Sequence, residues 1–335
     1  MKIGLITDAW YPQVNGVVRT MSHVRDELVD LGHEFLVVSP DQFRTFPCPR
    51  YPEIRLSVHP LRRVRQLIEE GRPDALHIAT EGPLGLMARR YCRRRGLPFT
   101  TSYHTQYAQY LRKYVGLPTS IGYRGLRWFH NAAAATLVPT RSIRDELAER
   151  GFRNLHVWTR GVDTDLFRPY GKDLIDDPRP IFIYVGRVSR EKNIQAFLDA
   201  KLPGTKYVVG DGPEMPALKR RHPKVRFVGF KHGEELARYF AAADVFVFPS
   251  LTDTFGVVLL EAMACGVPAA AYPVTGPIDV VEQGVSGILD EDIERAAVAA
   301  LDLDPEVCRN FALEFSWRRC AEMFLETLEP HAAWR

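Results

Sequence analysis

The sequence predicts an α/β protein built from two doubly wound, Rossmann-like domains that face each other across a cleft. Short apolar runs alternate with amphipathic segments along the chain, as in parallel sheets covered by helices. At 335 residues the chain exceeds the usual size of one hydrophobic core. The alternation also restarts near the middle of the chain. Ligands of such folds bind at the carboxyl ends of the strands, so functional residues are expected in the loops that follow strands.

The first half contains the first set of expected elements. Short apolar runs predict strands at 2–7, 34–39, 75–79, 98–103 and 135–138. Amphipathic segments predict helices near 18–31, 83–95 and 141–150. This order of strands and helices is typical of a parallel sheet.

The second half repeats the pattern after a segment without periodicity. Residues 167–172 and 176–180 combine Pro, Gly and charge, which is typical of a linker. Strands are then expected at 180–185, 206–209, 225–228, 245–248 and 269–271. We therefore expect an N-terminal domain at 1–168 and a C-terminal domain at 169–335. The last helix, at about 316–329, is expected to pack back towards the N-terminal domain.

The composition excludes several classes of protein. Hydrophobic residues make up 46% and charged residues 25%, which is ordinary for a soluble globular protein. Because no apolar run approaches the roughly 18 residues of a membrane span, and the N-terminal apolar run is too short for a signal peptide, we expect a cytoplasmic protein. Five cysteines without C-x-x-C spacing predict neither a disulfide framework nor a zinc site.

Charge is distributed unevenly along the chain. Residues 1–160 hold 24 Lys and Arg against 14 Asp and Glu, a net +10, and the remainder carries −7. Local clusters of arginine can form a solvated helix face, or they can bind an anionic membrane surface. In the second case each basic residue contributes about 1 kcal/mol to the free energy of membrane binding. Nucleic acid is not expected, because no recognised binding motif accompanies the arginines. The clustered arginines are Arg62, Arg63, Arg65, Arg89, Arg90, Arg93, Arg94 and Arg95.

The segment from Pro249 to Pro268 is the most informative part of the chain. It follows an apolar strand and carries two carboxylates, Asp253 and Glu261, around the start of an apolar helix. The Phe-Gly step after Asp253 permits a tight turn, which leaves backbone N–H groups at a helix N-terminus where an anion binds. A phosphate beside two carboxylates that bind hydroxyl groups describes a nucleotide sugar.

Further candidate residues in the second half also follow strands. Arg187 and Lys192 lie in one loop, where a planar guanidinium and an ammonium can clamp a diphosphate. The glycines Gly210, Gly212 and Gly229 let the backbone approach a base or a ribose closely. The alternative for each is an ordinary surface loop, and only the set as a whole is specific.

Two candidates lie in the first half. Asn15-Gly16 predicts a sharp turn into a helix N-terminus. His104 follows the fourth expected strand and can donate to a sugar hydroxyl or to a developing charge, although a single histidine is more often structural.

Taken in order, these motifs resemble the retaining glycosyltransferase family 4, the group-1 glycosyltransferases with the two-domain GT-B fold. The resemblance runs through Asn15-Gly16, His104, Arg160-Gly161-Val162-Asp163, Gly186-Arg187, Glu191-Lys192-Asn193, Gly210–Glu214 and Phe255–Ala262. It implies that Arg187 and Lys192 neutralise the donor diphosphate, that Glu261 binds the ribose and that Asp253 binds the donor sugar. His104 would lie beside the reacting face of the sugar. The resemblance also implies that the N-terminal domain, 1–168, binds the acceptor and that the C-terminal domain, 169–335, binds the nucleotide sugar. The implied donor-binding residues are Gly16, Gly186, Gly210, Gly212, Gly229, Phe255, Gly256, Val257 and Val258.

The chain departs from the family at one position, where Asp253 replaces the usual first Glu of the E-x7-E motif. This shorter carboxylate leaves the donor sugar open. No Asp-x-Asp motif follows any of the strands expected above, so we expect a metal-independent enzyme without a cofactor. The amino-acid sequence at Trp10–Val17 resembles that of lipid glycosyltransferases of the diacylglycerol and sulfoquinovosyl type. That likeness implies a lipid acceptor and peripheral attachment to the inner face of the membrane. It favours a UDP-sugar as the donor, with GDP-mannose as the alternative.

Other functions remain open on the sequence. The acceptor could instead be a soluble or cell-envelope glycan, or the chain could be a hydrolase or an epimerase of the nucleotide sugar. A binding module without catalysis is the third class, and Arg187, Lys192, Asp253 and Glu261 argue against it.

Overall fold

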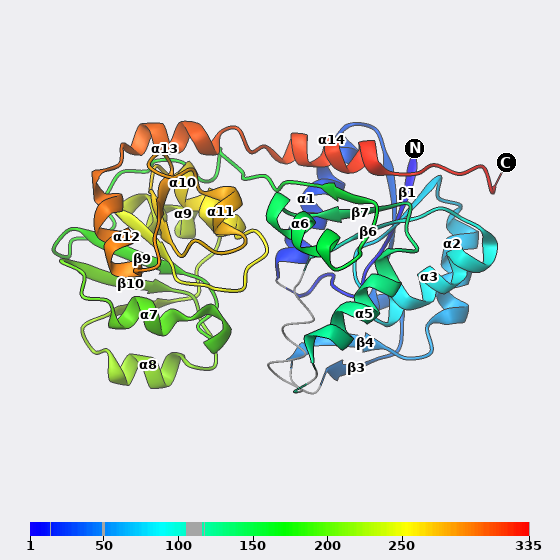
Figure 1. Ribbon diagram of the computed structural model, residues 1–335, viewed down its shortest axis with the longest axis horizontal. Helices are drawn as coiled ribbons and strands as arrows, with labels where there is room; N and C mark the ends of the chain where they lie inside the picture. Colours follow the sequence, from blue (N-terminus) through cyan, green and yellow to red (C-terminus); the bar gives the residue numbers. More distant parts are fainter. Residues whose placement is uncertain (14, 49–50, 105–115, 117, 335) are drawn as a thin grey trace. The chain divides into compact units, whose positions relative to one another are not determined.

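The computed structural model describes residues 1–13, 15–48, 51–104, 116 and 118–334. It divides the chain into two compact units, Met1–Thr159 with Trp317–Arg335, and Arg160–Ser316 (Figure 1). The second unit begins before the boundary expected at 168/169, because Val162 and Phe167 are buried in its core.

The first unit contains a six-stranded parallel sheet in the order β2-β1-β5-β6-β7-β8. Its strands are β1 (Lys2–Ile6), β2 (Glu34–Val38), β5 (Ala75–Ile78), β6 (Thr100–Ser102), β7 (Ala135–Val138) and β8 (Leu155–Val157). A separate antiparallel hairpin pairs β3 (Thr45–Cys48) with β4 (Tyr51–Ser57). The helices of this unit are α1 (Gly16–Asp30), η1 (Pro40–Gln42), α2 (Leu61–Gly71), α3 (Pro83–Arg95), α5 (Thr119–His130), α6 (Arg141–Glu149) and α14 (Trp317–Thr327).

Local sequence signals set the ends of these helices. Asn15 caps α1 by accepting hydrogen bonds from two backbone N–H groups, and the hydroxyl of Thr140 caps α6 by accepting one, from the N–H of Ile143. Pro83 occupies the first turn of α3, where its missing N–H costs nothing, and Gly96 ends that helix in the left-handed region. The helices therefore begin and end close to the positions expected from the sequence.

The C-terminal helix α14 belongs to the first unit. Trp317 stacks on His23 of α1 with ring centroids 4.4 Å apart. The indole Nε1 of Trp158 donates to the carbonyl of Cys320 at 2.8 Å, and Phe324 packs against the Trp158 ring at 5.5 Å. A segment far away in sequence thus completes the core of the N-terminal unit.

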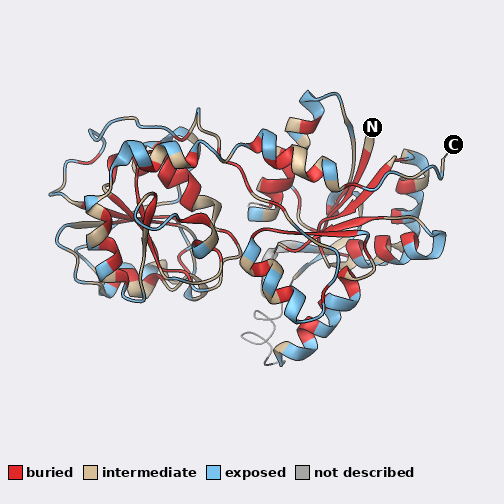
Figure 2. Cartoon of the chain, turned by 45° about the horizontal axis from the view of Figure 1, so that its top comes forward, coloured by how far each residue is buried: buried red, intermediate tan, exposed pale blue. Residues whose placement is uncertain are grey.

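The second unit contains another six-stranded parallel sheet, in the order β11-β10-β9-β12-β13-β14. Its strands are β9 (Ile181–Val185), β10 (Thr205–Val209), β11 (Arg226–Gly229), β12 (Val245–Phe248), β13 (Ala269–Ala271) and β14 (Gly287–Leu289). Its helices are η2 (Arg190–Lys192), α7 (Ile194–Asp199), α8 (Met215–Arg221), α9 (Gly233–Ala242), α10 (Val257–Ala264), α11 (Pro277–Val280), α12 (Ile293–Ala299), η3 (Ala300–Asp302) and α13 (Pro305–Ala312). Buried residues concentrate along the sheet and the inner helix faces in each unit (Figure 2).

The structure corrects two expectations about the elements. The strands β8 and β14 and the β3–β4 hairpin were not expected, because their short runs carry little periodicity. The expected linker is part of the second unit: Phe167 packs against Phe240, and Lys172 pairs with Asp244 at 2.7 Å. In the described part of the chain, no helix combines the length and the apolar character needed to cross a membrane.

Candidate active site

Three strand ends come together at the carboxyl edge of the second sheet. The N–H of Gly186 donates to the carbonyl of Val209 at 3.0 Å, and the N–H of Gly210 donates to the carbonyl of Gly229 at 2.8 Å. A Cβ atom on Gly210 would lie 1.9 Å from the carbonyl oxygen of Gly186, so only glycine fits there. The predicted glycines thus hold the ends of β9, β10 and β11 close together.

Beyond β9, internal hydrogen bonds shape the loop that carries the predicted diphosphate clamp. The hydroxyl of Tyr184 donates to the carbonyl of Arg187 at 2.8 Å, and the Arg187 side chain is exposed. Val188 packs against Gly212, because a Cβ atom added to Gly212 would lie 2.3 Å from the carbonyl oxygen of Val188. Asn193 has a left-handed φ of 52°, and its Nδ2 donates to the carbonyl of Pro249 at 3.0 Å. Asn193, which belongs to the Glu191-Lys192-Asn193 motif but had no expected role of its own, therefore ties this loop to the end of β12.

Lys192 and Asp253 meet directly. The ammonium Nζ of Lys192 lies 2.5 Å from Oδ1 of Asp253, and both side chains are partly buried. The other oxygen of Asp253, Oδ2, is buried and has no hydrogen-bond partner among the described residues. Two residues predicted for different tasks thus form one ion pair that retains an unused acceptor.

The start of α10 lies next to this pair. Gly256 precedes the helix with a left-handed φ of 84°, and no side chain caps the helix within the described structure. Val257 and Val258 are half-buried, and the Phe255 ring packs into the core. Gly276 packs against the same turn, because an added Cβ would lie 2.7 Å from the carbonyl oxygen of Asp253. The turn therefore presents backbone N–H groups beside a carboxylate.

Glu261 lies on α10, with only 2% of the residue exposed. Burial, followed by the carboxylate of Glu261, raises the pKa of the Cys265 thiol above its usual range, so the two groups interact. A buried carboxylate is costly unless its hydrogen bonds are satisfied. The buried carboxylate of Glu261 therefore needs hydrogen-bond donors close to it, unlike a carboxylate at the surface.

The two predicted site residues of the first unit lie at the carboxyl edge of its own sheet. Gly16 is the exposed first residue of α1, directly after Asn15, whose Oδ1 accepts from the N–H groups of Val17 and Val18 at 3.0 and 3.1 Å. His104 follows β6, is half-buried, and lies edge-on to Trp158 with ring centroids 5.9 Å apart.

The sequence interpretation missed a buried carboxylate at the same edge. Asp8 follows β1 and accepts hydrogen bonds from the N–H groups of Leu84 and Gly85, at 2.9 and 3.3 Å, and from the hydroxyl of Thr80 at 2.9 Å. Burial raises the pKa of Asp8 to about 6, although these hydrogen bonds oppose the shift. Its place after the first strand was the signal that could have identified it.

The clustered arginines do not form one uniform surface. Arg89 is buried: its guanidinium donates to the carbonyls of Phe129 and Trp128 and stacks over the Trp128 ring at 3.5 Å. Its expected membrane role is therefore wrong, because it joins α3 to α5 inside the unit. The other seven, Arg62, Arg63, Arg65, Arg90, Arg93, Arg94 and Arg95, are exposed.

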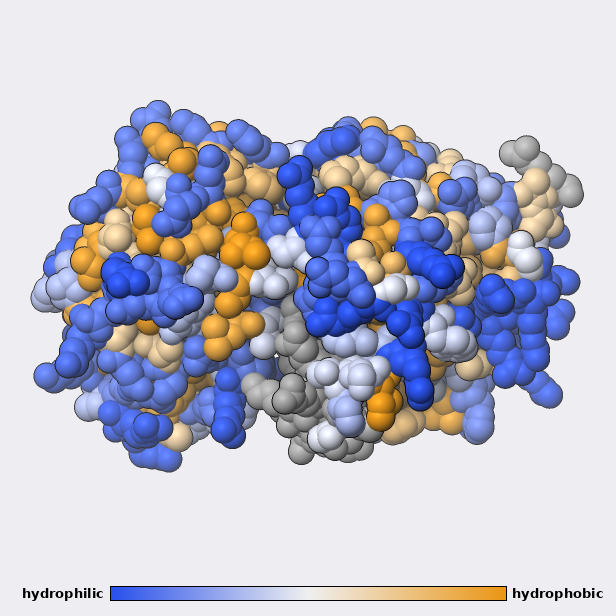
Figure 3. Space-filling view, in the orientation of Figure 1, coloured by the Kyte–Doolittle hydropathy of each residue, from blue (hydrophilic) through white to orange (hydrophobic). Residues whose placement is uncertain are grey.

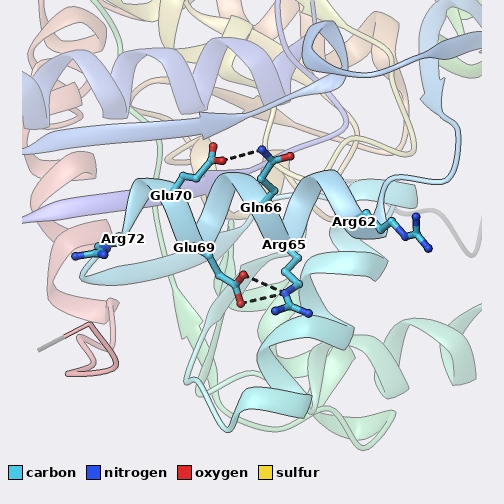
Figure 4. Close-up of a pocket in the computed structure, with 6 residues that line it drawn as sticks. All are labelled: Arg62, Arg65, Gln66, Glu69, Glu70 and Arg72. Atoms are coloured by element: carbon cyan, nitrogen blue, oxygen red, sulfur yellow. Dashed lines mark hydrogen bonds and ion pairs between the residues drawn. The ribbon is translucent and has the colours of Figure 1, made fainter.

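Two of these exposed arginines share a carboxylate. Arg65 and Arg95 lie 3.0 and 3.1 Å from oxygens of Glu69, and the hydrogen bond from Arg65 lowers the pKa of that carboxyl group. A hollow of about 530 Å³ lies along α2, where Figure 4 shows Arg65 paired with Glu69 and Gln66 paired with Glu70. Hydrophilic residues cover much of the face seen in Figure 3. Four of the six residues that line the hollow therefore pair with each other.

Comparisons with known proteins agree with the fold described above. The family described as Glycosyltransferase Family 4 matches residues 14–166, and the family described as Glycosyl transferases group 1 matches residues 179–303. A GDP-mannose-dependent alpha-mannosyltransferase of Corynebacterium glutamicum is 31% identical over 316 residues, covering 86% of this chain and 76% of the relative. The sulfoquinovosyl transferase SQD2 of Arabidopsis thaliana is 30% identical over 313 residues, covering 83% of this chain and 61% of the relative. An alpha-monoglucosyldiacylglycerol synthase of Streptococcus pneumoniae is 27% identical over 370 residues, covering 97% of this chain and 83% of the relative.

Solved structures share the fold. Sucrose-phosphate synthase from Thermosynechococcus elongatus superposes with a TM-score of 0.78 at 20% identity and covers 97% of each chain. Anabaena HepE in complex with UDP superposes with a TM-score of 0.73 at 17% identity, covering 98% of this chain and 99% of that one. The expected pair of Rossmann-like domains is confirmed.

Proposed function

Because the chain belongs to the group-1 glycosyltransferases of family 4, we propose that it is a retaining, metal-independent hexosyltransferase acting on a membrane lipid such as diacylglycerol. Family membership establishes the coarser statement that the protein is a glycosyltransferase of the GT-B fold using a nucleotide sugar. The stereochemistry, the independence of metal and the lipid acceptor are the parts that we propose.

The pairing of Lys192 with Asp253 carries this proposal. In the proposed role, Oδ2 of Asp253, buried and lacking a partner among the described residues, accepts a hydrogen bond from a hydroxyl of the donor sugar. The ammonium of Lys192 and the exposed guanidinium of Arg187 then compensate the charge of the leaving diphosphate. These cations supply the charge that a divalent ion supplies in metal-dependent enzymes.

The remaining donor contacts follow from the same edge of the sheet. We assign the ribose hydroxyls to Glu261 and the phosphates to the N–H groups of Val257 and Val258, which the left-handed Gly256 exposes at the start of α10. During transfer the anomeric carbon loses its bond to the diphosphate and forms one to the acceptor oxygen on the same face. The proton of the acceptor hydroxyl leaves with the nucleoside diphosphate.

Relatives support both the lipid acceptor and an alternative. Two of the named relatives are a sulfoquinovosyl transferase and an alpha-monoglucosyldiacylglycerol synthase, and the second name favours a lipid acceptor. With this acceptor we propose a UDP-sugar as the donor. GDP-mannose-dependent alpha-mannosyltransferases are equally similar, at 29 to 31% identity, and favour GDP-mannose as the donor. Asp253 in place of Glu leaves room for either donor.

Incubation with labelled UDP-glucose or GDP-mannose, with and without dioctanoylglycerol, tests the proposal. A labelled α-linked glycolipid is the expected product, and its formation should persist in EDTA. If a labelled product forms only with soluble glycans, the acceptor is a glycan and not a lipid. If the nucleotide sugar is altered without transfer, the protein is an epimerase or a hydrolase.

A further inference from the structure

Glu81 occupies the same edge of the first sheet as His104 and Asp8. β5 pairs with β6, and Glu81 and His104 follow the ends of these two strands by three and two residues, so both lie in loops at the carboxyl edge. The register of β1 with β5 likewise places Asp8 beside Thr80. The N–H of Asp8 indeed donates to the Thr80 hydroxyl at 2.7 Å, which shows that this register continues past the strand ends.

A buried polar network holds the carboxylate of Glu81. Oε1 of Glu81 lies 3.0 Å from Nε2 of His130, whose side chain is fully buried. Nδ1 of His130 lies 2.9 Å from the hydroxyl of Thr101, which contacts the hydroxyl of Thr136 at 3.0 Å. Such a chain of hydrogen bonds orients the imidazole, which in turn orients the carboxylate.

The neighbouring carboxylates differ in their capacity to bind a ligand. Both oxygens of Asp8 are occupied, by the Leu84 and Gly85 N–H groups and the Thr80 hydroxyl. Glu81 uses only Oε1, its side chain is 11% exposed, and Oε2 has no hydrogen-bond partner in the described ranges. A carboxylate oxygen accepts further hydrogen bonds readily.

We propose that Glu81 accepts a hydrogen bond from the reacting acceptor's hydroxyl groups and selects a neutral, hydroxyl-bearing acceptor over an anionic one. This inference rests on the proposed function and on one step beyond it, namely that the acceptor binds at the carboxyl edge of the first unit. A fixed negative charge attracts a hydroxyl donor and repels a phosphate carried by the acceptor, so one residue supplies both affinity and discrimination. His130 is the positioning residue that holds Glu81.

The test compares Glu81→Gln with the wild type in three assays on the full chain. These are donor hydrolysis by water, transfer to the neutral probes dioctanoylglycerol and octyl glucoside, and transfer to the anionic probe dioctanoyl phosphatidylglycerol. For Glu81→Gln we expect kcat/KM with the neutral probe to fall about 10- to 100-fold, the loss of one charge-assisted hydrogen bond. Donor hydrolysis should stay within two-fold, and preference for the neutral over the anionic lipid should decrease.

Two further variants separate positioning from folding. Glu70→Gln is the matched control, because Glu70 is an exposed carboxylate of α2 bonded to Gln66, and it should transfer sugar at the wild-type rate. His130→Gln retains a hydrogen-bond donor and should lower transfer to the neutral probes. Its effect should not add to that of Glu81→Gln, because both changes disturb one carboxylate.

The outcomes separate this inference from the proposed function. Transfer to octyl glucoside but not to dioctanoylglycerol would remove the lipid acceptor and still test Glu81. Neutral-acceptor kcat/KM unchanged in folded Glu81→Gln, or equal losses of hydrolysis and transfer, would overturn the inference. Wild-type hydrolysis without transfer to any neutral probe would overturn it as well.

Discussion

Arg187 and Lys192 differ in how far they are exposed to solvent, but both are proposed to compensate the charge of the leaving diphosphate. Arg187 projects from an exposed loop, whereas Lys192 is held against Asp253. Removing either cation should leave the fold intact and lower kcat by about 100-fold or more, because charge on the leaving diphosphate is then uncompensated. Steady-state kinetics and circular dichroism of Arg187→Ala and Lys192→Ala check this expectation. Near wild-type turnover in the double variant would remove the clamp.

The carboxylates of Asp253 and Glu261 are expected to act separately. Glu261→Gln should weaken binding of the free nucleoside diphosphate, because the ribose loses a charged acceptor. Asp253→Asn should leave that affinity within about two-fold and depress transfer, since it contacts the sugar in the proposed site. Calorimetry with UDP and GDP distinguishes them, and equal losses of affinity would contradict this division.

At the scale of elements, Asp8 joins the end of β1 to the start of α3. Its carboxylate accepts two N–H groups of the first turn of α3, and its carbonyl accepts from Nε2 of Gln13 at 3.2 Å. Asn15, which caps α1, donates to Oε1 of Gln13 at 3.3 Å. One buried residue therefore links the first turns of two helices.

Asp8 should make the stability of the protein depend on pH. Burial raises its pKa from the usual 3.8 to about 6, so between these values the folded state holds a proton that the unfolded chain has released. Its stabilising contribution is fully present below about pH 4 and is lost as the pH rises through about 6. The free energy of unfolding relative to Asp8→Asn should fall by up to about 3 kcal/mol over that window.

Urea denaturation of the wild type and of Asp8→Asn at pH 4 and pH 7 measures this change. Subtracting the two proteins cancels the other titrating groups, because they are common to both. A difference that stays constant across the window would show that Asp8 is not strained by burial.

For the whole molecule, charge separates the two halves of the sequence. The exposed arginines of α2 and α3 lie in the basic half, whereas Arg89 is buried. If the exposed arginines bind an anionic bilayer, the protein should co-sediment with anionic vesicles. Binding should fall with salt, because charges are screened beyond about 8 Å at physiological ionic strength.

Replacing arginines of α3 tests this surface. Changing Arg90, Arg93, Arg94 and Arg95 to Gln should reduce vesicle binding and lipid glycosylation together, each residue contributing about 1 kcal/mol. The matched control changes four exposed cations of the other unit, Lys219, Arg220, Arg221 and Lys224, and should bind vesicles like the wild type. Sedimentation insensitive to salt would point to apolar insertion instead.

The sequence alone determined the two-domain α/β organisation and most strands and helices, because each long apolar or amphipathic run carries its own periodicity. Strands such as 135–138, 245–248 and 269–271 agree with the structure at both ends. The sequence also identified the glycines, because a left-handed or crowded backbone position restricts the residue type locally, as at Gly210 and Gly256.

Only the tertiary structure decided which side chains meet. The pairing of Lys192 with Asp253, the network that holds Glu81, and the burial of Arg89 beneath α5 join residues distant in sequence. Packing of the last helix towards the N-terminal domain was expected, but the partners of α14, such as His23 for Trp317, have the same origin. Periodicity records only whether a residue faces the core, whereas its partner depends on strand order and register, which arise when the whole sheet assembles.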